Sequence, residues 1–171
     1  MSREGVKEQI RAAFAGVERP GNWALRGSNE GEEPYLVDRD FADKADWRTL
    51  DAAFLDWAPD GYGSALSFLS DEAFRYFLPA YLLADLDGAL QTVDPVFHLT
   101  HGLDDATRDQ PLNPRRYGAR TWLDAMRHKF AVFTKQEAAA ILAYLRLRLG
   151  DPCDEDRIAS AIRNYWSPRA E

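Results

Sequence analysis

The chain has 171 residues, 46% of them hydrophobic and 12% aromatic, which predicts a single globular domain over residues 1–171 and excludes collagen-like, low-complexity and disordered classes. The net charge of −7 argues against non-specific binding of the whole molecule to nucleic acid or anionic lipid. A single cysteine, Cys153, excludes an internal disulfide framework and a multi-cysteine metal site.

No apolar run approaches the roughly 20 residues that a membrane span needs, so we expect no membrane partner. The first residues, MSREGVKEQIRAAF, carry Glu and Gln where a signal peptide would be apolar. We therefore expect a cytoplasmic protein.

The first predicted helix follows the stripe Val6, Ile10, Phe14 and Val17, which are spaced four, four and three residues apart. Residues 18–45 are rich in Gly, Asn and carboxylates, and we interpret them as a long irregular acidic loop. Their carboxylate spacing does not match a calcium loop. Within this loop we expect at most a short extended pair around residues 35–37.

A second stripe, Trp47, Leu50, Phe54 and Trp57, predicts one helix that Asp46 caps. It is followed by the sequence Gly61-Tyr62-Gly63-Ser64, which lacks the third glycine of a nucleotide loop and the flanking pattern of a nucleophile elbow. We interpret that sequence as a hinge or a helix start.

The segment 71–88 predicts a central helix, because it is apolar over most of its circumference. Ser70 stands at its N-cap position. Pro79 lies inside it and predicts a kink or a break near Arg75–Tyr76, since the proline ring clashes with the carbonyl four residues earlier.

Residues 91–116 are expected to be a connection, with one short helical turn around residues 96–99. Apolar residues from Leu123 to Phe133 predict the next helix, and the capping-box sequence Thr134-Lys135-Gln136-Glu137 opens another. Asp154 is expected to cap the last helix. The prediction is an all-α fold, a compact bundle of about six helices around the central Pro-kinked apolar helix.

Motifs that carry chemistry are few. His98 and His101 share the spacing of two metal ligands on a helical turn, but they lie in a Pro-rich connection, so we interpret them as weak metal candidates and expect no metal site. The carboxylates beside Cys153 would raise the pKa of its thiol, which makes a nucleophilic role improbable. We predict no catalytic and no cofactor-binding residue, and no cofactor.

Arg75 is the one basic residue of the largely apolar 71–88 segment, where it serves either the structure or a ligand. We expect the structural role. If a pocket lies beside this helix, Arg75, Tyr76 and Tyr81 are the residues predicted to contact a ligand or partner.

Residues 114–171 hold 11 basic and 7 acidic residues in an otherwise acidic chain. Arginines such as Arg115, Arg116 and Arg120 could contact phosphates or pair with the acidic segment 85–109. Because the net charge is acidic and no nucleic-acid-binding motif is present, we expect no nucleic-acid partner.

The sequence ALSFLSDEAFRYFLPAYLLADL, together with Trp47-Arg48-Thr49-Leu50 and a later Phe133-Thr134 segment, resembles an uncharacterised bacterial family known as a domain of unknown function. Its mark is the SDEAFRYFLPAYL helix. The resemblance implies a small helical cytoplasmic protein and no particular activity.

Two functional hypotheses remain. The first is a non-enzymatic protein-binding module, immunity-like or adaptor, because aromatic residues are abundant and the charge is unevenly distributed. The alternative is a small ligand-binding protein or enzyme with a pocket beside the 71–88 helix. A flat acidic or aromatic face would favour the first hypothesis, and a pocket with convergent polar groups the second.

Overall fold

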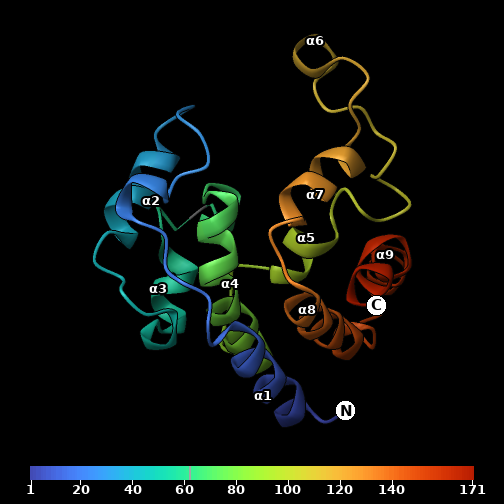
Figure 1. Cartoon of the computed structure of the whole chain (residues 1–171), viewed down its shortest axis with the longest axis horizontal. Coiled ribbons are helices and arrows are strands. Elements are labelled where there is room, and N and C mark those ends of the chain that lie inside the picture. The colour runs from blue at the N-terminus through green and yellow to red at the C-terminus, as the bar shows by residue number, and fades with distance from the viewer. Residues whose placement is uncertain (62) are drawn as a thin grey trace. The chain divides into compact units, whose positions relative to one another are not determined.

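A computed structural model describes residues 1–61 and 63–171 and confirms the all-α prediction (Figure 1). No strand occurs in these ranges; the only β pairings there are the isolated bridges Arg26–Leu69, Pro59–Ser64 and Pro111–Thr121. Backbone contacts divide the chain into two compact units. One comprises Ile10–Pro95, here called the 10–95 unit, and the other Val96–Glu171 with Met1–Gln9, here called the 96–171 unit. The single domain remains a prediction.

The helices are shorter and more numerous than the expected six or so. The first helix, α1 (Arg3–Phe14), begins in the 96–171 unit and ends in the 10–95 unit. The remaining helices of the 10–95 unit are η1 (Asn22–Ala24), α2 (Glu33–Phe41), η2 (Trp47–Thr49), α3 (Ala52–Trp57), η3 (Ala65–Ser67) and α4 (Asp71–Leu86). The helices of the 96–171 unit are α5 (Pro95–Thr100), α6 (Pro114–Tyr117), α7 (Trp122–Phe130), α8 (Lys135–Arg148), α9 (Glu155–Ala161), the π-helical η4 (Ile162–Trp166) and α10 (Ser167–Ala170). The first of them, α5, starts one residue before the unit.

The irregular loop predicted over residues 18–45 is wrong in part, because α2 occupies its second half and residues 35–37 are helical rather than extended. Pro34 stands in the first turn of α2, where its missing N–H costs no hydrogen bond. The guanidinium of Arg19 donates to the carbonyls of Phe41 (2.7 Å) and Lys44 (2.6 Å) at the end of α2. One arginine therefore satisfies helix-terminal acceptors and orders the segment.

The single helix predicted from Trp47 to Trp57 is wrong, since the segment forms η2 and α3 with an extended residue, Leu50, between them. Asp46 caps the first piece as expected, by accepting from the Arg48 N–H at 2.9 Å. Asp51 caps the second by accepting from the Phe54 N–H at 2.8 Å. Two capping aspartates five residues apart thus stabilise two short helices instead of one.

The helix expected over 71–88 is α4. Ser70 caps it by accepting from the Ala73 N–H (3.1 Å), and its hydroxyl donates to the Ala24 carbonyl (2.6 Å). The helix continues across Pro79 to Leu86, so the expected break is absent; the kink and the central position remain predictions. Ten of its residues are buried: Ala73, Phe74, Tyr76, Phe77, Leu78, Pro79, Ala80, Tyr81, Leu82 and Leu86.

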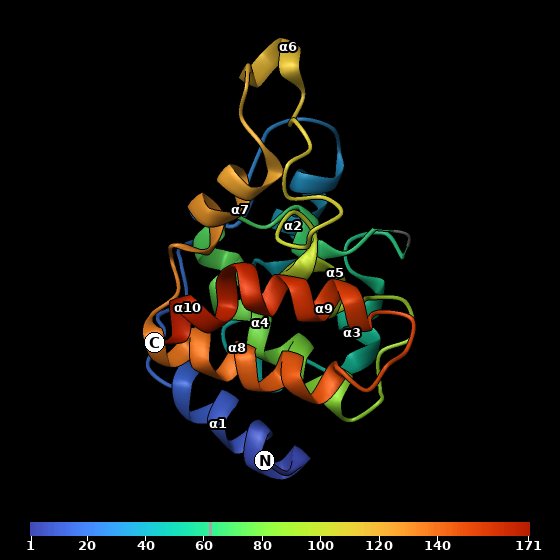
Figure 2. The same cartoon turned by 90° about the vertical axis from the view of Figure 1, so that its right-hand side faces the viewer.

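The 96–171 unit is built on α8, which packs against α9, η4 and α10 (Figures 1 and 2). The predicted capping box is present: the Thr134 hydroxyl accepts from the Glu137 N–H (3.2 Å), and the Glu137 carboxylate accepts from the Thr134 N–H (3.0 Å). The side chain of Asp154 makes no capping hydrogen bond to α9 and instead binds Arg157 at 2.6 Å, so that capping prediction is wrong.

The aromatic cluster of this unit joins α7 to η4. The ring centroids of Phe130 and Trp166 are 5.0 Å apart, and those of Tyr165 and Trp166 are also 5.0 Å apart. The indole N–H of Trp166 donates to the Leu99 carbonyl at 2.7 Å, so the polar atom of this buried ring is satisfied.

Candidate functional site

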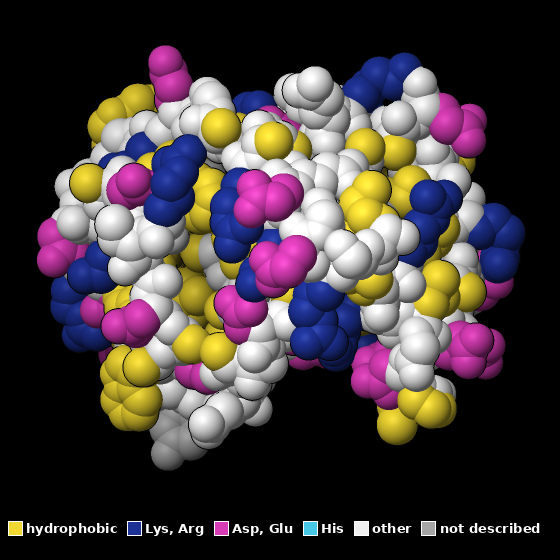
Figure 3. Space-filling model, turned by 90° about the horizontal axis from the view of Figure 1, so that it is seen from below, with side chains coloured by type: hydrophobic (Ala, Val, Ile, Leu, Met, Phe, Trp, Pro, Cys, Tyr) yellow, Lys and Arg dark blue, Asp and Glu magenta, His cyan; other side chains and the backbone are white. Residues whose placement is uncertain are grey.

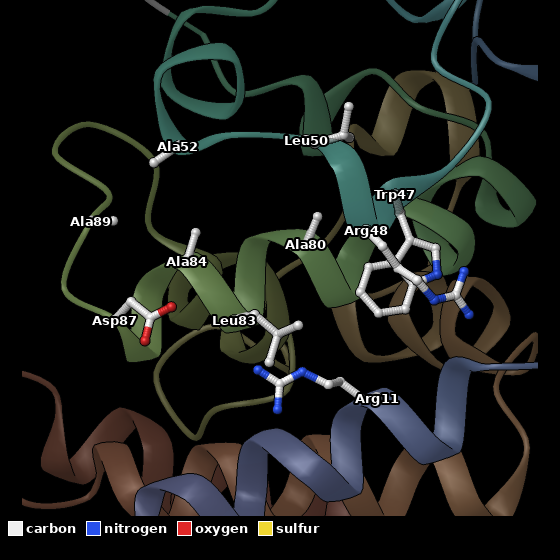
Figure 4. A pocket seen from close by; sticks show the side chains of 10 residues that line it. All are labelled: Arg11, Trp47, Arg48, Leu50, Ala52, Ala80, Leu83, Ala84, Asp87 and Ala89. Atoms are coloured by element: carbon white, nitrogen blue, oxygen red, sulfur yellow. The ribbon is translucent and has the colours of Figure 1, made fainter.

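A cavity of about 420 Å³ lies beside α4, within the 10–95 unit. Its apolar lining comes mainly from one face of α4, on which Ala80, Leu83 and Ala84 are spaced three and four residues apart. Figure 4 shows Arg11 reaching from α1 towards Leu83, with Asp87 on one side of it and Trp47 and Arg48 on the other. The rim therefore carries charges of both signs around an apolar lining. Leu50, Ala52 and Ala89 complete the lining.

Arg48 is held by three groups at this cavity. Its guanidinium binds the Asp46 carboxylate at 3.0 Å, donates to the Ala15 carbonyl at 3.1 Å, and lies 4.6 Å from the ring centroid of Trp47. The Arg48 N–H, and after it the guanidinium, lower the pKa of Asp46, although partial burial opposes them. Because these contacts fix the guanidinium before any ligand arrives, Arg48 can bind an anion at little entropic cost.

The three predicted contact residues do not line this cavity. Tyr76 is buried and donates its hydroxyl to the Ala45 carbonyl at 2.9 Å. Tyr81 is fully buried, and its hydroxyl has no hydrogen-bond partner in the described part of the chain. Burial, with a smaller effect of the Asp56 carboxylate, raises the pKa of Tyr81 well above its usual value. Arg75 is half-buried and is not without a partner.

The two histidines lie against the same aromatic ring. The imidazole of His101 stacks on Phe97 with centroids 4.9 Å apart and meets Trp122 edge-on at 4.7 Å, while His98 meets Phe97 edge-on at 5.5 Å. Burial lowers the pKa of His98 to about 4, and the charges of Lys129 and His101 add to that effect. Burial also lowers the pKa of His101. In the described ranges no three His, Cys, Asp or Glu side chains are grouped to hold a metal ion.

A second hollow of about 630 Å³ lies in the 96–171 unit, where His101 and the exposed Cys153 are among the lining residues. Two of its charged lining residues are paired, since Arg163 binds Asp105 at 2.6 Å, and Asn164 binds the same carboxylate at 2.9 Å. Asn164, and secondarily Arg163, hold the pKa of Asp105 below its usual range, against partial desolvation. This arrangement is a structural network.

Charge differs sharply between the two units. The 10–95 unit carries 7 basic and 16 acidic residues, a net charge of −9, whereas the 96–171 unit carries 14 basic and 12 acidic residues, a net charge of +2. In Figure 3, acidic and basic side chains are interspersed with hydrophobic ones.

Large apolar side chains exposed to solvent are a further feature of the 10–95 unit. The indole of Trp23 is 89% exposed and that of Trp57 is 68% exposed, although such rings are normally well buried. Both lie outside regular core positions: Trp23 within η1, and Trp57 at the end of α3, beside Gly61. The position of Trp57 in the apolar stripe from Trp47 to Trp57 gave no sign of this exposure.

Sequence reasoning missed the cavity residues Arg11, Arg48 and Asp87. Arg11 and Asp87 belong to no motif, and Arg48 enters only through the Trp47-Arg48-Thr49-Leu50 segment of the family resemblance, which assigns it no role. The only signal available was the small-residue face of α4 at Ala80 and Ala84, which leaves room beside a helix that is otherwise lined with large side chains.

Comparisons with known proteins bear on the whole chain. No helix in the described ranges is both long and apolar enough to cross a membrane. Neither the comparison with curated proteins nor that with solved structures found a match. Residues 2–170, nearly the whole chain, match a family model. The chain belongs to this family, which is a family of unknown function (DUF6714).

Proposed function

We propose that the chain is a non-enzymatic protein-binding module, immunity-like or adaptor, that engages a basic protein through its 10–95 unit. The observation that carries the proposal is the coincidence, in one compact unit, of a net charge of −9 and two tryptophans that are 89% and 68% exposed.

The two features have complementary physical effects. An acidic surface raises the association rate of a basic partner by long-range attraction, over the roughly 8 Å reach that charges keep at physiological salt. Tryptophan is the residue type that most often dominates binding energy at protein interfaces, because its large ring is desolvated when the partner docks. Trp23 and Trp57 therefore contribute most of the binding energy. The carboxylates raise the association rate and favour basic partners over acidic ones.

The experiment begins with chemical cross-linking in source cells, followed by reconstitution of the captured protein with the purified chain. We expect a basic partner whose association rate falls by at least tenfold between roughly 0.05 and 0.5 M salt. Trp23→Ser or Trp57→Ser should weaken the equilibrium affinity by at least tenfold, which is about 1.4 kcal/mol. The matched control is Phe97→Ser, an exposed aromatic residue of the other unit.

Two outcomes would contradict this proposal. One is a partner whose affinity is the same for wild type and both tryptophan variants. The other is turnover of a substrate by the purified chain, because the proposal assigns no reaction to it.

The cavity beside α4 favours a second candidate function, the binding of a small ligand. Its volume of about 420 Å³ is within the range of small-molecule sites, and Arg11, Arg48 and Asp87 offer charges of both signs at the rim. A small zwitterion fits this lining, with its carboxylate at an arginine, its ammonium at Asp87 and its apolar part against Leu83.

The probe is a panel of the free amino acids at millimolar concentration, measured by thermal shift and calorimetry. Binding at this cavity should be abolished by Ala84→Phe, which fills it, and retained by Ala53→Phe, which places the same ring on α3 outside it. If no amino acid raises the melting temperature of the wild type, this second function is excluded for that ligand class.

A further inference from the structure

The 96–171 unit carries a protruding arm, residues 110–122, whose tip is α6. Two backbone hydrogen bonds close its base: the Trp122 N–H donates to the Gln110 carbonyl (3.0 Å), and the Leu112 N–H donates to the Arg120 carbonyl (2.9 Å). In both Figure 1 and Figure 2, α6 lies at the far end of a loop that extends away from α7. The arm is thus a hairpin-like excursion with a helical turn at its end.

The composition of the arm is one-sided. Arg115 and Arg116 are exposed, Arg120 is half-buried, and residues 110–122 contain no Asp or Glu. Tyr117 is 41% exposed, and the guanidinium of Arg116 lies 5.4 Å from its ring centroid. The exposed Arg115, Arg116 and Tyr117 and the half-buried Arg120 therefore lie on one arm of a chain whose net charge is −7.

These residue types match a protein interface. Arginine and tyrosine are among the residues most enriched at binding hot spots, because each combines a large, flat contact surface with hydrogen-bond donors. Arginine in particular forms paired hydrogen bonds with a carboxylate. A carboxylate-rich partner segment would offer acceptors to the exposed Arg115 and Arg116, and to Arg120, whose charge also acts on Asp124.

A nucleic acid fits less well. Its affinity would rest on phosphate neutralisation, and three arginines release few counterions, while the acidic net charge of the chain repels the rest of a long polyanion. An acidic segment of a protein is short enough to contact the arm alone.

We propose that the arm formed by residues 110–122 is a docking surface for an acidic segment of a partner protein, with Arg115, Arg116 and Arg120 binding carboxylates and Tyr117 packing against the segment. The residues of this surface lie outside the 10–95 unit, and their charge is positive whereas the net charge of that unit is negative. It therefore goes beyond the proposed function, and each of the two surfaces can fail without the other.

The test uses the full chain and a fluorescein-labelled peptide of ten glutamates, titrated by anisotropy at roughly 50 mM salt. The triple variant Arg115→Glu, Arg116→Glu, Arg120→Glu should weaken binding at least tenfold, and Tyr117→Ser at least threefold. The matched control is Arg3→Glu, Lys135→Glu, Arg146→Glu, which changes three exposed positions of the same unit and gives the chain the same net charge. Its affinity should stay within twofold of the wild type.

Three outcomes would overturn the proposal. The first is that the peptide does not bind the wild type at 1 mM protein. The second is that the two triple variants lose affinity equally, which would mean that only net charge matters. The third is that a 20-nucleotide single strand binds the wild type more tightly than the peptide does and loses affinity in the arm variant, which would make the arm a nucleic-acid surface. Circular dichroism and thermal melting of both triple variants establish that the comparison is made between folded proteins.

Discussion

Arg75 is the one basic residue of α4, a helix most of whose residues are buried. Pro79 has no N–H to donate to the Arg75 carbonyl, so that carbonyl loses its helical partner. A buried carbonyl without a hydrogen bond costs about 1–3 kcal/mol, so a neighbouring donor that restores one stabilises the helix. Arg75 is half-buried, and its structural role remains a prediction.

We predict that Arg75→Met lowers the melting temperature and leaves partner binding intact once the chain is folded. The thioether replaces the apolar stem of arginine but supplies none of its hydrogen-bond donors. Thermal melting and a binding titration measure the two effects, with Arg39→Met as a control at an exposed pair with Asp40. Unchanged melting together with lost binding would instead place Arg75 in a binding site.

His98 makes stability depend on pH. Its pKa is about 4 in the folded chain and about 6.5 when unfolded, so between these values the unfolded state binds more protons. The stabilisation is therefore complete above pH 6.5 and is lost as the pH falls towards 4.

Between pH 7 and pH 4.5 we expect His98 to account for a loss of about 2 kcal/mol in the free energy of unfolding. Urea denaturation at the two pH values measures it. His98→Gln should reduce the pH-dependent difference by that amount, whereas His128→Gln, at an exposed position of α7, should leave it unchanged. Equal pH dependence in wild type and His98→Gln would refute the assignment.

At the scale of elements, the caps explain where the helices begin. The capping box of α8 joins Thr134 to Glu137, whose side chain is almost fully buried. A second box, from Thr121 to Asp124, opens α7, with the Thr121 hydroxyl accepting from the Asp124 N–H at 3.3 Å. Both satisfy helix donors that would otherwise lack a partner.

Thr134→Ala should destabilise the chain by about 1 kcal/mol, because the Glu137 N–H loses its acceptor. Thr134→Ser keeps the hydroxyl and should cost much less. Urea denaturation of the two variants gives the comparison. If serine and alanine are equally destabilising, the effect comes from the lost methyl group and not from the cap.

Sequence patterns identified the helices that combine a capping residue with a continuous apolar stripe. Ser70 and Thr134 marked the starts of α4 and α8 correctly, and Val6, Ile10 and Phe14 of α1 are fully buried as predicted. The patterns failed for short helices held by distant groups. α2 depends on Arg19, which is far from it in sequence, and periodicity within α2 does not reveal that contact.

The candidate site was less predictable than the fold. A cavity depends on which side chains fail to fill a space, and this is decided by packing between segments that are distant in sequence. Arg11, Arg48 and Ala84 come together only through such packing. The exposure of Trp57 was likewise hidden, because the apolar spacing of its segment is the same whether α3 begins at Trp47 or at Ala52.

At the scale of the whole molecule, the boundary between the two compact units falls inside α1, between Gln9 and Ile10. A helix forms and melts cooperatively, so unfolding of one unit would disrupt a helix that the other unit also uses. The predicted single domain then implies one unfolding transition, in which the calorimetric and van't Hoff enthalpies agree.

Two core substitutions, one in each unit, test this prediction. Phe77 is fully buried with its ring 4.8 Å from that of Phe41, and Phe130 is fully buried against Trp166. Phe77→Ala and Phe130→Ala should each cost about 3–5 kcal/mol, because they leave cavities in packed cores. If the chain is one cooperative domain, each variant shifts a single calorimetric transition to lower temperature as a whole. Two independent domains would instead give two calorimetric transitions, and only the transition of the unit that carries the substitution would shift. A separate outcome concerns the core: if Phe77→Ala lowers the free energy of unfolding by less than about 1 kcal/mol, this face of α4 is not core.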